Sequence, residues 1–372
     1  MRIGVLASVG HMVDSFFHEI IDSWVDAGHT VSVAAGTPTA DGESVVISGL
    51  GRRPGPGTLA AWSGLRAWAR DEALDIVLTN SATASALVRT ARLRIPVVYF
   101  CHGLHWNTGT RLSDGVWQIV EEALLRRTDA VITINSDDHA WFTARVASRR
   151  LLRLHTGVGL DLDRYREASP PSEERPPQSL QSQAPHEGRL ELVWIGEFSA
   201  RKRPESAVDV AAGLRFLGVD FRLRMIGEGS RRGVVNDRIR RLGLTQNVAA
   251  AGSGSAAAAL RGSHGLLHTA TWEGLPRVML EGLAVGRRAY AFDVKGVRDV
   301  PEAVLVADGD VDALVASIWA EWSSGRMTAP LSYDRTALDS TRSADAVRNL
   351  LEALTDPSDP GAGRIAVSRG TR

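Results

Sequence analysis

The chain has 372 residues, more than one ordinary hydrophobic core holds, so its length predicts two domains. Its 43 basic and 43 acidic residues cancel, which argues against a general nucleic-acid-binding protein, and no nucleic-acid partner is expected. Cys101 is the only cysteine, which excludes an intrachain disulfide and a cysteine metal cluster and favours a reducing, cytoplasmic compartment. No run of 18 apolar residues predicts a membrane-spanning helix.

The first half of the sequence alternates between strand-like and helix-like segments. A β-rich run at 2–8 ends in a glycine turn and does not continue as the long apolar region of a secretory signal. Helix-length segments and apolar strands then follow one another: 13–28, 30–35, 58–73, 75–80, 85–94, 96–102, 113–127 and 130–135. This alternation predicts βαβ units and a parallel sheet covered on both faces.

Residues 166–189 break the pattern, because they are rich in proline and polar residues, and they predict a linker or insertion. The alternation restarts after them and predicts a second domain over 190–337, with a helix at about 276–285 among its elements. We therefore expect an α/β protein with two Rossmann-like domains facing across a cleft, the first over 1–165. A helix over 338–354 would pack back on the first domain, and 355–372 would form a disordered tail.

Open parallel sheets bind ligands at the carboxyl ends of their strands, so the loops there are the candidate sites. The segment TATWEGLPRVMLEGLAVG carries two glutamates eight positions apart, Glu273 and Glu281. Glu273 precedes a turn that leads into a helix, and amides at a helix start favour phosphate. A glutamate here can accept sugar hydroxyls, and Glu281 can accept two at once, as a ribose presents them. The turn consists of Gly274, Leu275 and Pro276, and Pro276 suits a first helical turn.

The glutamate pair resembles the E-x7-E motif of the retaining GT-B glycosyltransferases of family 4, and the resemblance extends over nearly the whole chain. It implies that Glu281 holds the nucleotide ribose and that Glu273 acts at the donor sugar as a catalytic residue. WIGEFSARKRP resembles the segment in which an arginine and a lysine bind the donor diphosphate, and Lys202 falls on the family lysine. Glu197 stands where the arginine is usual, so Arg201 or Arg203 would supply the missing charge.

Two further segments of the second half extend the resemblance. NVAAAG resembles the segment whose backbone meets the nucleobase, which implies a donor contact at Val248. VKGVRD resembles the loop after the E-x7-E helix and adds Arg298 to the acceptor-binding residues, with an ion pair to Asp299 as the structural alternative.

In the first half, CHGLHWNTG and DAVITINSDD resemble bacterial capsular and exopolysaccharide glycosyltransferases, which act on lipid-diphosphate-linked sugars at the inner membrane face. ASVGHMVDSFF resembles their first loop and implies a donor contact at Gly10 and an acceptor contact at His11. GRRPGPG resembles a loop that adds Arg53 to the acceptor set. His102 follows a strand and would reach the cleft as a catalytic residue, and His105 would contact the acceptor. For both histidines, a core or capping role is the alternative.

The resemblance implies transfer, with retention, from a nucleotide sugar to a lipid-diphosphate-linked saccharide in capsule or exopolysaccharide synthesis, and a UDP-sugar is favoured. Asn80, Ser81 and Ala82 replace the His-Thr-Pro of the subgroup, which would mark a different acceptor. No metal or other cofactor is expected, because the helix terminus, Lys202 and the arginines carry the phosphate charge. The D-x-D triplets at 161–163 and 310–312 are expected to be a turn and a cap.

Three alternatives stay open at this point. The acceptor could be a soluble metabolite, the protein could be a nucleotide-sugar 2-epimerase, or it could be a non-catalytic scaffold with a glycosyltransferase-like fold. Peripheral contact with the membrane is a weaker expectation that rests on AWSGLRAWARD and RTARLR, for which an ordinary amphipathic helix is the alternative.

Overall fold

The computed structural model describes residues 1–52, 55, 57–104, 106, 112–168, 188–356 and 358. The chain divides into two compact units, of which the first comprises Met1–Gly159 and Asp339–Arg372 and the second comprises Leu160–Leu338. Residues 160–165, which the sequence grouped with the first domain, therefore belong to the second unit.

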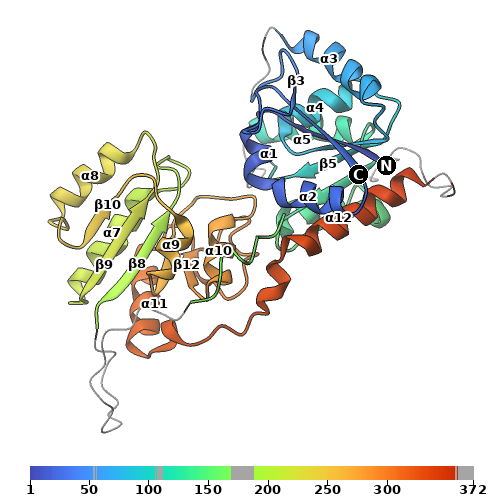
Figure 1. The fold of residues 1–372 in the computed structure, drawn as a ribbon. Helices are drawn as coiled ribbons and strands as arrows, with labels where there is room; N and C mark the ends of the chain where they lie inside the picture. Colours follow the sequence, from blue (N-terminus) through green and yellow to red (C-terminus); the bar gives the residue numbers. More distant parts are fainter. Residues whose placement is uncertain are drawn as a thin grey trace. The chain divides into compact units, whose positions relative to one another are not determined.

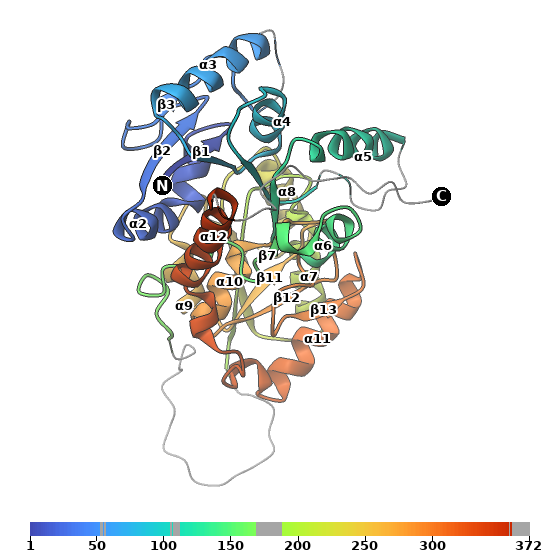
Figure 2. The same ribbon diagram turned by 90° about the vertical axis from the view of Figure 1, so that its right-hand side faces the viewer.

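The first unit is built around a parallel sheet of order β3-β2-β1-β4-β5-β6-β7 (Figure 1). Helices α3, α4 and α5 form one layer over it, and α2 packs against α12 in a second layer (Figures 1 and 2). Its elements are β1 (Arg2–Ala7), α1 (His11–Phe16), α2 (His18–Asp26), β2 (Thr30–Ala35), β3 (Val45–Val46), α3 (Thr58–Asp71), β4 (Ile76–Thr79), α4 (Ala82–Thr90), β5 (Val97–Cys101), α5 (Leu112–Leu125), β6 (Ala130–Thr133), α6 (Ser136–Thr143), a 3-10 turn (Ser148–Arg150), β7 (Leu151–Arg153) and α12 (Ser340–Thr355).

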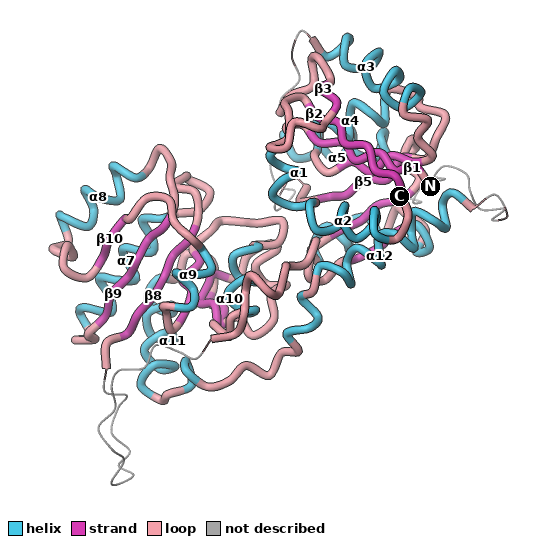
Figure 3. The backbone as a smooth tube through the Cα atoms, in the orientation of Figure 1, coloured by secondary structure: helices cyan, strands magenta, loops and turns pink. Residues whose placement is uncertain are grey.

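The second unit repeats this plan with a parallel sheet of order β10-β9-β8-β11-β12-β13 (Figure 3). Helix α7 packs with α8 and α11, and α9 packs with α10. Its elements are β8 (Leu190–Ile195), α7 (Pro204–Phe216), β9 (Phe221–Ile226), α8 (Arg232–Arg241), β10 (Val248–Ala250), α9 (Ala256–Arg261), β11 (Gly265–His268), α10 (Arg277–Ala284), β12 (Arg288–Phe292), β13 (Val304–Val306), α11 (Val311–Ser323) and two 3-10 turns (Arg326–Thr328, Arg335–Leu338).

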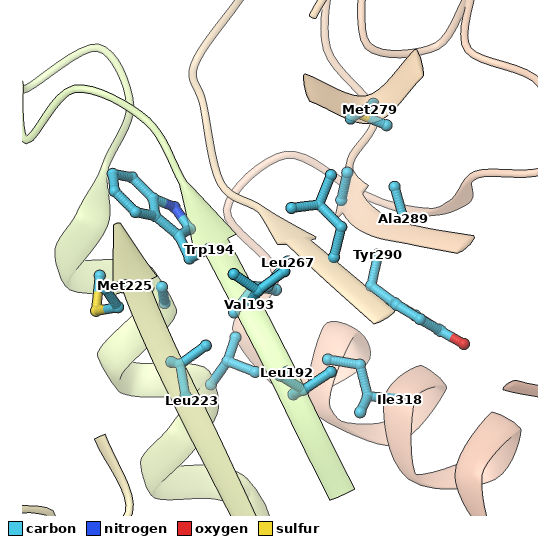
Figure 4. Packing of buried hydrophobic residues seen from close by; sticks show 14 of the residues in the cluster. Leu192, Val193, Trp194, Leu223, Met225, Leu267, Met279, Ala289, Tyr290 and Ile318 are labelled. Atoms are coloured by element: carbon cyan, nitrogen blue, oxygen red, sulfur yellow. The ribbon is translucent and has the colours of Figure 1, made fainter. Parts of the chain in front are cut away.

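The central strands are buried along their whole length because helices cover both of their faces. Every residue of β4, β5, β6 and β11 is buried. Figure 4 shows the core of the second unit, where side chains of β8 and β11 pack between Met279 of α10 and Ile318 of α11. The alternation of strands and helices thus forms two sheets, each with its own hydrophobic core. In both sheets, loops follow the carboxyl ends of the strands.

The helix expected over 13–28 is divided into α1 and α2. Phe17 leaves the helical region, with φ −123° and ψ −3°, and is fully buried. Its ring meets Phe100 of β5 edge-on at 5.3 Å between ring centroids. Packing of this one aromatic side chain on the sheet outweighs the cost of interrupting the helix, and Gly28 still ends α2 at a φ of +86°.

Candidate active site

Three loops meet at the carboxyl ends of β8, β11 and β12 in the second unit. The amide of Thr271, after β11, donates to the carbonyl of Arg201, after β8, at 2.8 Å. The amide of Glu273 donates to the carbonyl of Lys295, after β12, at 2.9 Å. Backbone hydrogen bonds therefore hold the RKR turn, the glutamate turn and the following loop together at the edge where parallel sheets bind ligands.

Gly296 allows the third loop to lie directly against the glutamate turn. Its φ is +75°, and a Cβ atom there would lie 2.4 Å from the carbonyl oxygen of Glu273 and 2.5 Å from that of Gly274. Both the backbone conformation and the lack of space demand glycine at this position.

Glu273 is buried and faces three basic side chains. Arg201 donates to its Oε2 at 2.6 Å, Lys202 forms an ion pair with its Oε1, and Nε2 of His268 lies 3.5 Å from the same Oε1. Burial alone would raise the pKa of Glu273, but the contact with His268 and the charges of Lys202 and Arg201 outweigh it and hold this pKa well below its usual range. Glu273 is therefore an ionised carboxylate that keeps two cations in place.

His268 and Trp272 complete this cluster, and sequence reasoning singled out neither. His268 is the last residue of β11 and is buried, which lowers its pKa, so that a neutral imidazole faces Glu273. The guanidinium of Arg201 lies over the ring of Trp272 at 5.4 Å and also donates to the carbonyl of that residue. A histidine as the last residue of a central strand, five positions before Glu273, was the signal available in the sequence.

Glu281 lies on α10 and is also buried, but it already has partners. The hydroxyl of Tyr165 donates to its Oε1 at 2.8 Å, and Nε of Arg277, one helical turn earlier, lies 3.4 Å from the same oxygen. Tyr165 is held in turn by Arg335, which donates to the carbonyls of Leu162 and Tyr165. These contacts fix the orientation of the carboxylate, and no sequence motif pointed to Tyr165.

Helix α10 begins one residue later than the sequence predicted, at Arg277 instead of Pro276. Pro276 precedes the helix as its N-cap residue, with φ −74° and ψ 98°, and the first helical residue is Arg277. Gly274 and Leu275 lie between Glu273 and this cap, so their backbone leads directly into the amino end of α10.

Three residues expected at the donor or acceptor site have other contacts or a buried position in the second unit. Arg203 has a left-handed backbone, and its guanidinium is held by the carbonyl of Ala270 and the carboxylate of Asp308. Val248 is a buried core residue at the amino end of β10, opposite to the edge that carries Glu273.

Arg298, the third of these residues, forms an ion pair with Asp293 at 2.8 Å. Glu197 is exposed, so the position of the usual arginine carries an acid at the surface.

In the first unit, His102 is packed among aromatic rings. It stacks on Phe100 at 4.5 Å between ring centroids and contacts Phe16 and Phe17. Burial lowers the pKa of His102 to about 4, so its imidazole is neutral at pH 7. Its Nε2 is buried and has no hydrogen-bond partner among the described residues. A neutral ring can offer a hydrogen bond here, but it does not supply a positive charge to a phosphate.

Gly10 and His11 begin α1 of the same unit. The amide of Gly10 donates to Oγ1 of Thr37, and a Cβ atom at Gly10 would lie 2.1 Å from the carbonyl oxygen of Pro38, so close packing explains this glycine. His11 is exposed, and its Nε2 meets the guanidinium of Arg52 at 2.7 Å. Arg53 and His105 lie outside the described residues.

The residues that replace His-Thr-Pro have structural roles in the first unit. Asn80 is fully buried at the end of β4, the hydroxyl of Ser81 bonds to that of Ser8 at 2.6 Å, and Ala82 begins α4. Ser81 therefore links the ends of β1 and β4, whereas the buried side-chain amide of Asn80 has no hydrogen-bond partner among the described residues.

The D-x-D triplets form a turn and a helix cap. Oδ1 of Asp161 accepts from the amide of Asp163, and Asp310 caps α11 by accepting from the amide of Ala313. Within the described ranges, no group of three or more histidine, cysteine, aspartate or glutamate side chains is arranged to hold a metal ion. The same part of the chain contains no helix that is long and apolar enough to cross a bilayer.

The cluster combines a cation pair, a carboxylate and the start of a helix at one sheet edge. Arg201 and Lys202 can exchange Glu273 for a diphosphate, and Glu281 can accept ribose hydroxyls. Such an arrangement suits a nucleoside diphosphate whose diphosphate carries a further substituent, which would lie beside Glu273.

Comparisons with known proteins match both halves of the chain to glycosyltransferases. Residues 13–157 match the family model "Glycosyl transferase 4-like domain", and 177–320 match "Glycosyl transferases group 1". EpsD of Bacillus subtilis, a protein named as a glycosyltransferase, is 26% identical over 325 residues, which cover 81% of this chain and 82% of EpsD.

Two solved structures share the fold. Anabaena HepE in complex with UDP and glucose has a TM-score of 0.73 at 16% identity and covers 95% of this chain and 99% of its own. The apo form of the lipopolysaccharide outer core galactosyltransferase WaaB has a TM-score of 0.68 at 16% identity, with 94% and 99% covered.

The two parallel sheets share the GT-B fold of these glycosyltransferase structures, as the sequence predicted. The chain belongs to the group 1, or family 4, glycosyltransferases, enzymes that transfer a sugar from a nucleotide sugar to an acceptor.

Proposed function

We propose that this enzyme transfers a sugar, with retention at the anomeric carbon, from a UDP-sugar to a lipid-diphosphate-linked saccharide in the synthesis of a bacterial capsule or exopolysaccharide. The observation that carries the proposal is the convergence of Arg201 and Lys202 on Glu273, beside the turn that begins α10. UDP in the complex of HepE supports the choice of base, and the similarity to EpsD supports transfer over 2-epimerisation.

In the proposed complex, Glu281 accepts the ribose hydroxyls, and Arg201 and Lys202 bind the diphosphate. Backbone amides of Gly274 and Leu275 add donors at the helix start. As the bond between the anomeric carbon and the leaving phosphate oxygen breaks, negative charge grows on the diphosphate, and these cations stabilise it. The acceptor hydroxyl forms the new glycosidic bond, and its proton passes to the leaving phosphate.

Glu273 has two roles in this account. Before the donor binds, its carboxylate neutralises Arg201 and Lys202, and with donor bound it accepts hydrogen bonds from the hydroxyls of the transferred sugar. A neutral side chain of the same shape keeps the cations available to the diphosphate but removes the charge beside the sugar, so binding and transfer can be separated by one substitution.

The test is Glu273→Gln. We expect this variant to lose about 100-fold or more in transfer rate from radiolabelled UDP-hexoses, while its affinity for UDP stays within about threefold of wild type or rises. Glu205→Gln, which removes a carboxylate paired with Arg231 in the same unit, is the matched control and should change neither quantity. Full turnover by Glu273→Gln would contradict the proposed role.

The acceptor is tested in the same assay. Product should partition into organic solvent when bacterial lipid extract supplies the acceptor. Transfer only to water-soluble acceptors would instead favour a soluble metabolite as the natural substrate.

A further inference from the structure

His268 and Glu273 face each other in the candidate active site. Nε2 of His268 and Oε1 of Glu273 lie 3.5 Å apart. Both atoms are buried, and neither has a hydrogen-bond partner among the described residues, although Oε1 also forms the ion pair with Lys202. Because His268 is only 2% exposed, solvent does not satisfy Nε2 either. Nε2 therefore remains available for a hydrogen bond to Glu273.

Arg201 and Lys202 supply the counter-charge of Glu273 while they are paired with it. The diphosphate of a nucleotide sugar carries two negative charges, and in the proposed complex it takes both cations. Glu273 then keeps its own charge, is buried, and has only uncharged sugar hydroxyls as new partners. A buried carboxylate without a counter-charge is strongly destabilised. The donor complex therefore requires a further positive charge beside Glu273.

The elements that pack against β11 bring other charged groups to this edge, and most of them hold ion pairs of their own. Arg203 pairs with Asp308, Asp293 with Arg298, and Arg277 with Glu281. Lys295 is buried on the loop after β12, and its carbonyl accepts from the amide of Glu273. Ala291, which lies beside His268 on β12, is uncharged. Among the kinds of side chain in this group, only an imidazole has an ordinary pKa near neutral pH, so His268 is the one suited to gain the charge.

We propose that His268 is a positioning residue that takes up a proton from solvent when the donor binds and then holds Glu273 by donating from Nε2 to Oε1. The imidazolium replaces Arg201 and Lys202 as the counter-charge. The carboxylate stays ionised, and its orientation toward the hydroxyls of the transferred sugar is fixed. The inference rests on the proposed function, because it is the bound diphosphate that draws the two cations away.

The direction of the pH dependence follows from the charges. Burial and the charges of Lys202 and Arg201 lower the pKa of His268 in the free protein. The diphosphate adds negative charge and takes these cations, so the pKa of His268 rises on binding. At a pH between the two values, binding takes up a proton, and donor affinity falls as the pH rises.

The experiment is isothermal titration calorimetry of the full chain with UDP-glucose in two buffers of different ionisation enthalpy. Both phosphates of UDP-glucose are esterified, so this ligand does not itself titrate near neutral pH. For wild type, we expect an uptake of about 0.3 proton or more per donor at about pH 7. Its affinity should fall about fourfold or more between about pH 6 and about pH 8.

Two substitutions separate the proton from the hydrogen bond. His268→Gln can donate to Glu273 but cannot titrate, and His268→Leu does neither. Both should lose the proton uptake and the pH dependence. His268→Leu should also lose about tenfold in transfer rate, of which His268→Gln recovers about threefold or more. His264→Gln is the matched control, because His264 is a buried histidine just before the opposite end of β11, and it should take up the proton as wild type does.

The measurements on wild type decide the first part even if a variant does not fold. Binding of UDP-glucose by wild type without proton uptake overturns the inference and leaves the proposed function standing. NMR titration of the imidazole signals of wild type must also show one histidine whose pKa rises with UDP-glucose, and its absence overturns the inference as well.

The variants decide which group takes the proton. Loss of the uptake in both His268 variants, but not in His264→Gln, supports the assignment. Uptake that persists in both His268 variants overturns it and assigns the proton to another group, with Glu273 the first to examine. If neither UDP nor UDP-glucose binds to wild type, the proposed function and this inference are contradicted together.

Discussion

The hydroxyl of Tyr165 and the carboxylate of Glu281 form a buried hydrogen bond between residues that are 116 positions apart. Glu281 can present its oxygens to a ribose only if its side chain keeps one rotamer, and Tyr165 limits that choice. Arg335 anchors the backbone around Tyr165, so the tyrosine is itself fixed. We therefore regard Tyr165 as a positioning residue for the proposed ribose contact.

Tyr165→Phe tests this role because it removes only the hydroxyl. Loss of one hydrogen bond to a charged group predicts a fall in UDP affinity of about 3- to 10-fold. Isothermal titration calorimetry gives the Kd, and Tyr290→Phe is the control, since Tyr290 is a core tyrosine of the same unit outside this contact. An unchanged Kd for Tyr165→Phe, or the same loss in the control, would refute the assignment.

At the level of single residues, the sequence named members of the cluster but did not predict all of their contacts. It grouped Glu273 with Arg201 and Lys202, because a motif and a rare lysine mark them. It also assigned Arg203 to the donor, although Asp308, more than one hundred positions later, holds that guanidinium. Partners so distant in the chain depend on how strands are ordered in the sheet, and local patterns do not contain that information.

Among the elements, the loop after β12 meets a strict steric requirement where it packs against the glutamate turn. The glutamate turn keeps its place because Gly296 brings this loop within contact of the carbonyls of Glu273 and Gly274. Any Cβ atom there collides with backbone, which cannot move as a side-chain tip would.

Gly296→Ala should therefore displace the glutamate turn. We expect at least a tenfold loss of UDP affinity together with a destabilisation of about 1–3 kcal/mol, because the left-handed backbone and the collision act together. Gly218→Ala is the matched control: it has a φ of +76° but open space for a Cβ, and it should lower stability without a comparable effect on UDP binding. Calorimetry and chemical denaturation measure the two quantities. Normal UDP affinity in Gly296→Ala would show that the loop contact does not shape the site.

The pattern of apolar residues predicted most strands and helices, since the buried strands are mostly apolar. It did not show which side of a helix faces the core. The outward face of α5 depends on ion pairs from Glu121 to Arg89 and from Glu122 to Arg145, which form only in the folded unit. The division of 13–28 into α1 and α2 likewise follows from the packing of Phe17 on Phe100.

Each unit of the molecule is completed by a segment that lies far away in the chain. In the first unit, Trp24 of α2 donates to the carbonyl of Ala344 in α12, and the hydroxyl of Ser343 donates to the carbonyl of Gly157. In the second unit, Arg287 holds the carbonyl of Ala168, and Tyr165 reaches Glu281. The two α/β halves were predictable from their composition and periodicity, whereas the membership of 160–168 in the second unit depends on these long-range contacts.

We propose that the second unit binds a uridine diphosphate at Glu281, Arg201 and Lys202. The most direct measurement is a thermal-shift series with UDP, GDP, TDP and ADP on wild type, Glu281→Ala and the control Asp209→Ala, which removes an acid paired with Arg238. A ligand that binds the folded state raises Tm by mass action, and about 100 times the Kd should give a shift of about 5 °C or more.

The account predicts that UDP raises the Tm of wild type and of Asp209→Ala, that the other nucleotides raise it less, and that Glu281→Ala loses the UDP shift. If no nucleotide stabilises wild type, or if UDP stabilises Glu281→Ala as strongly as wild type, the assigned donor site is contradicted.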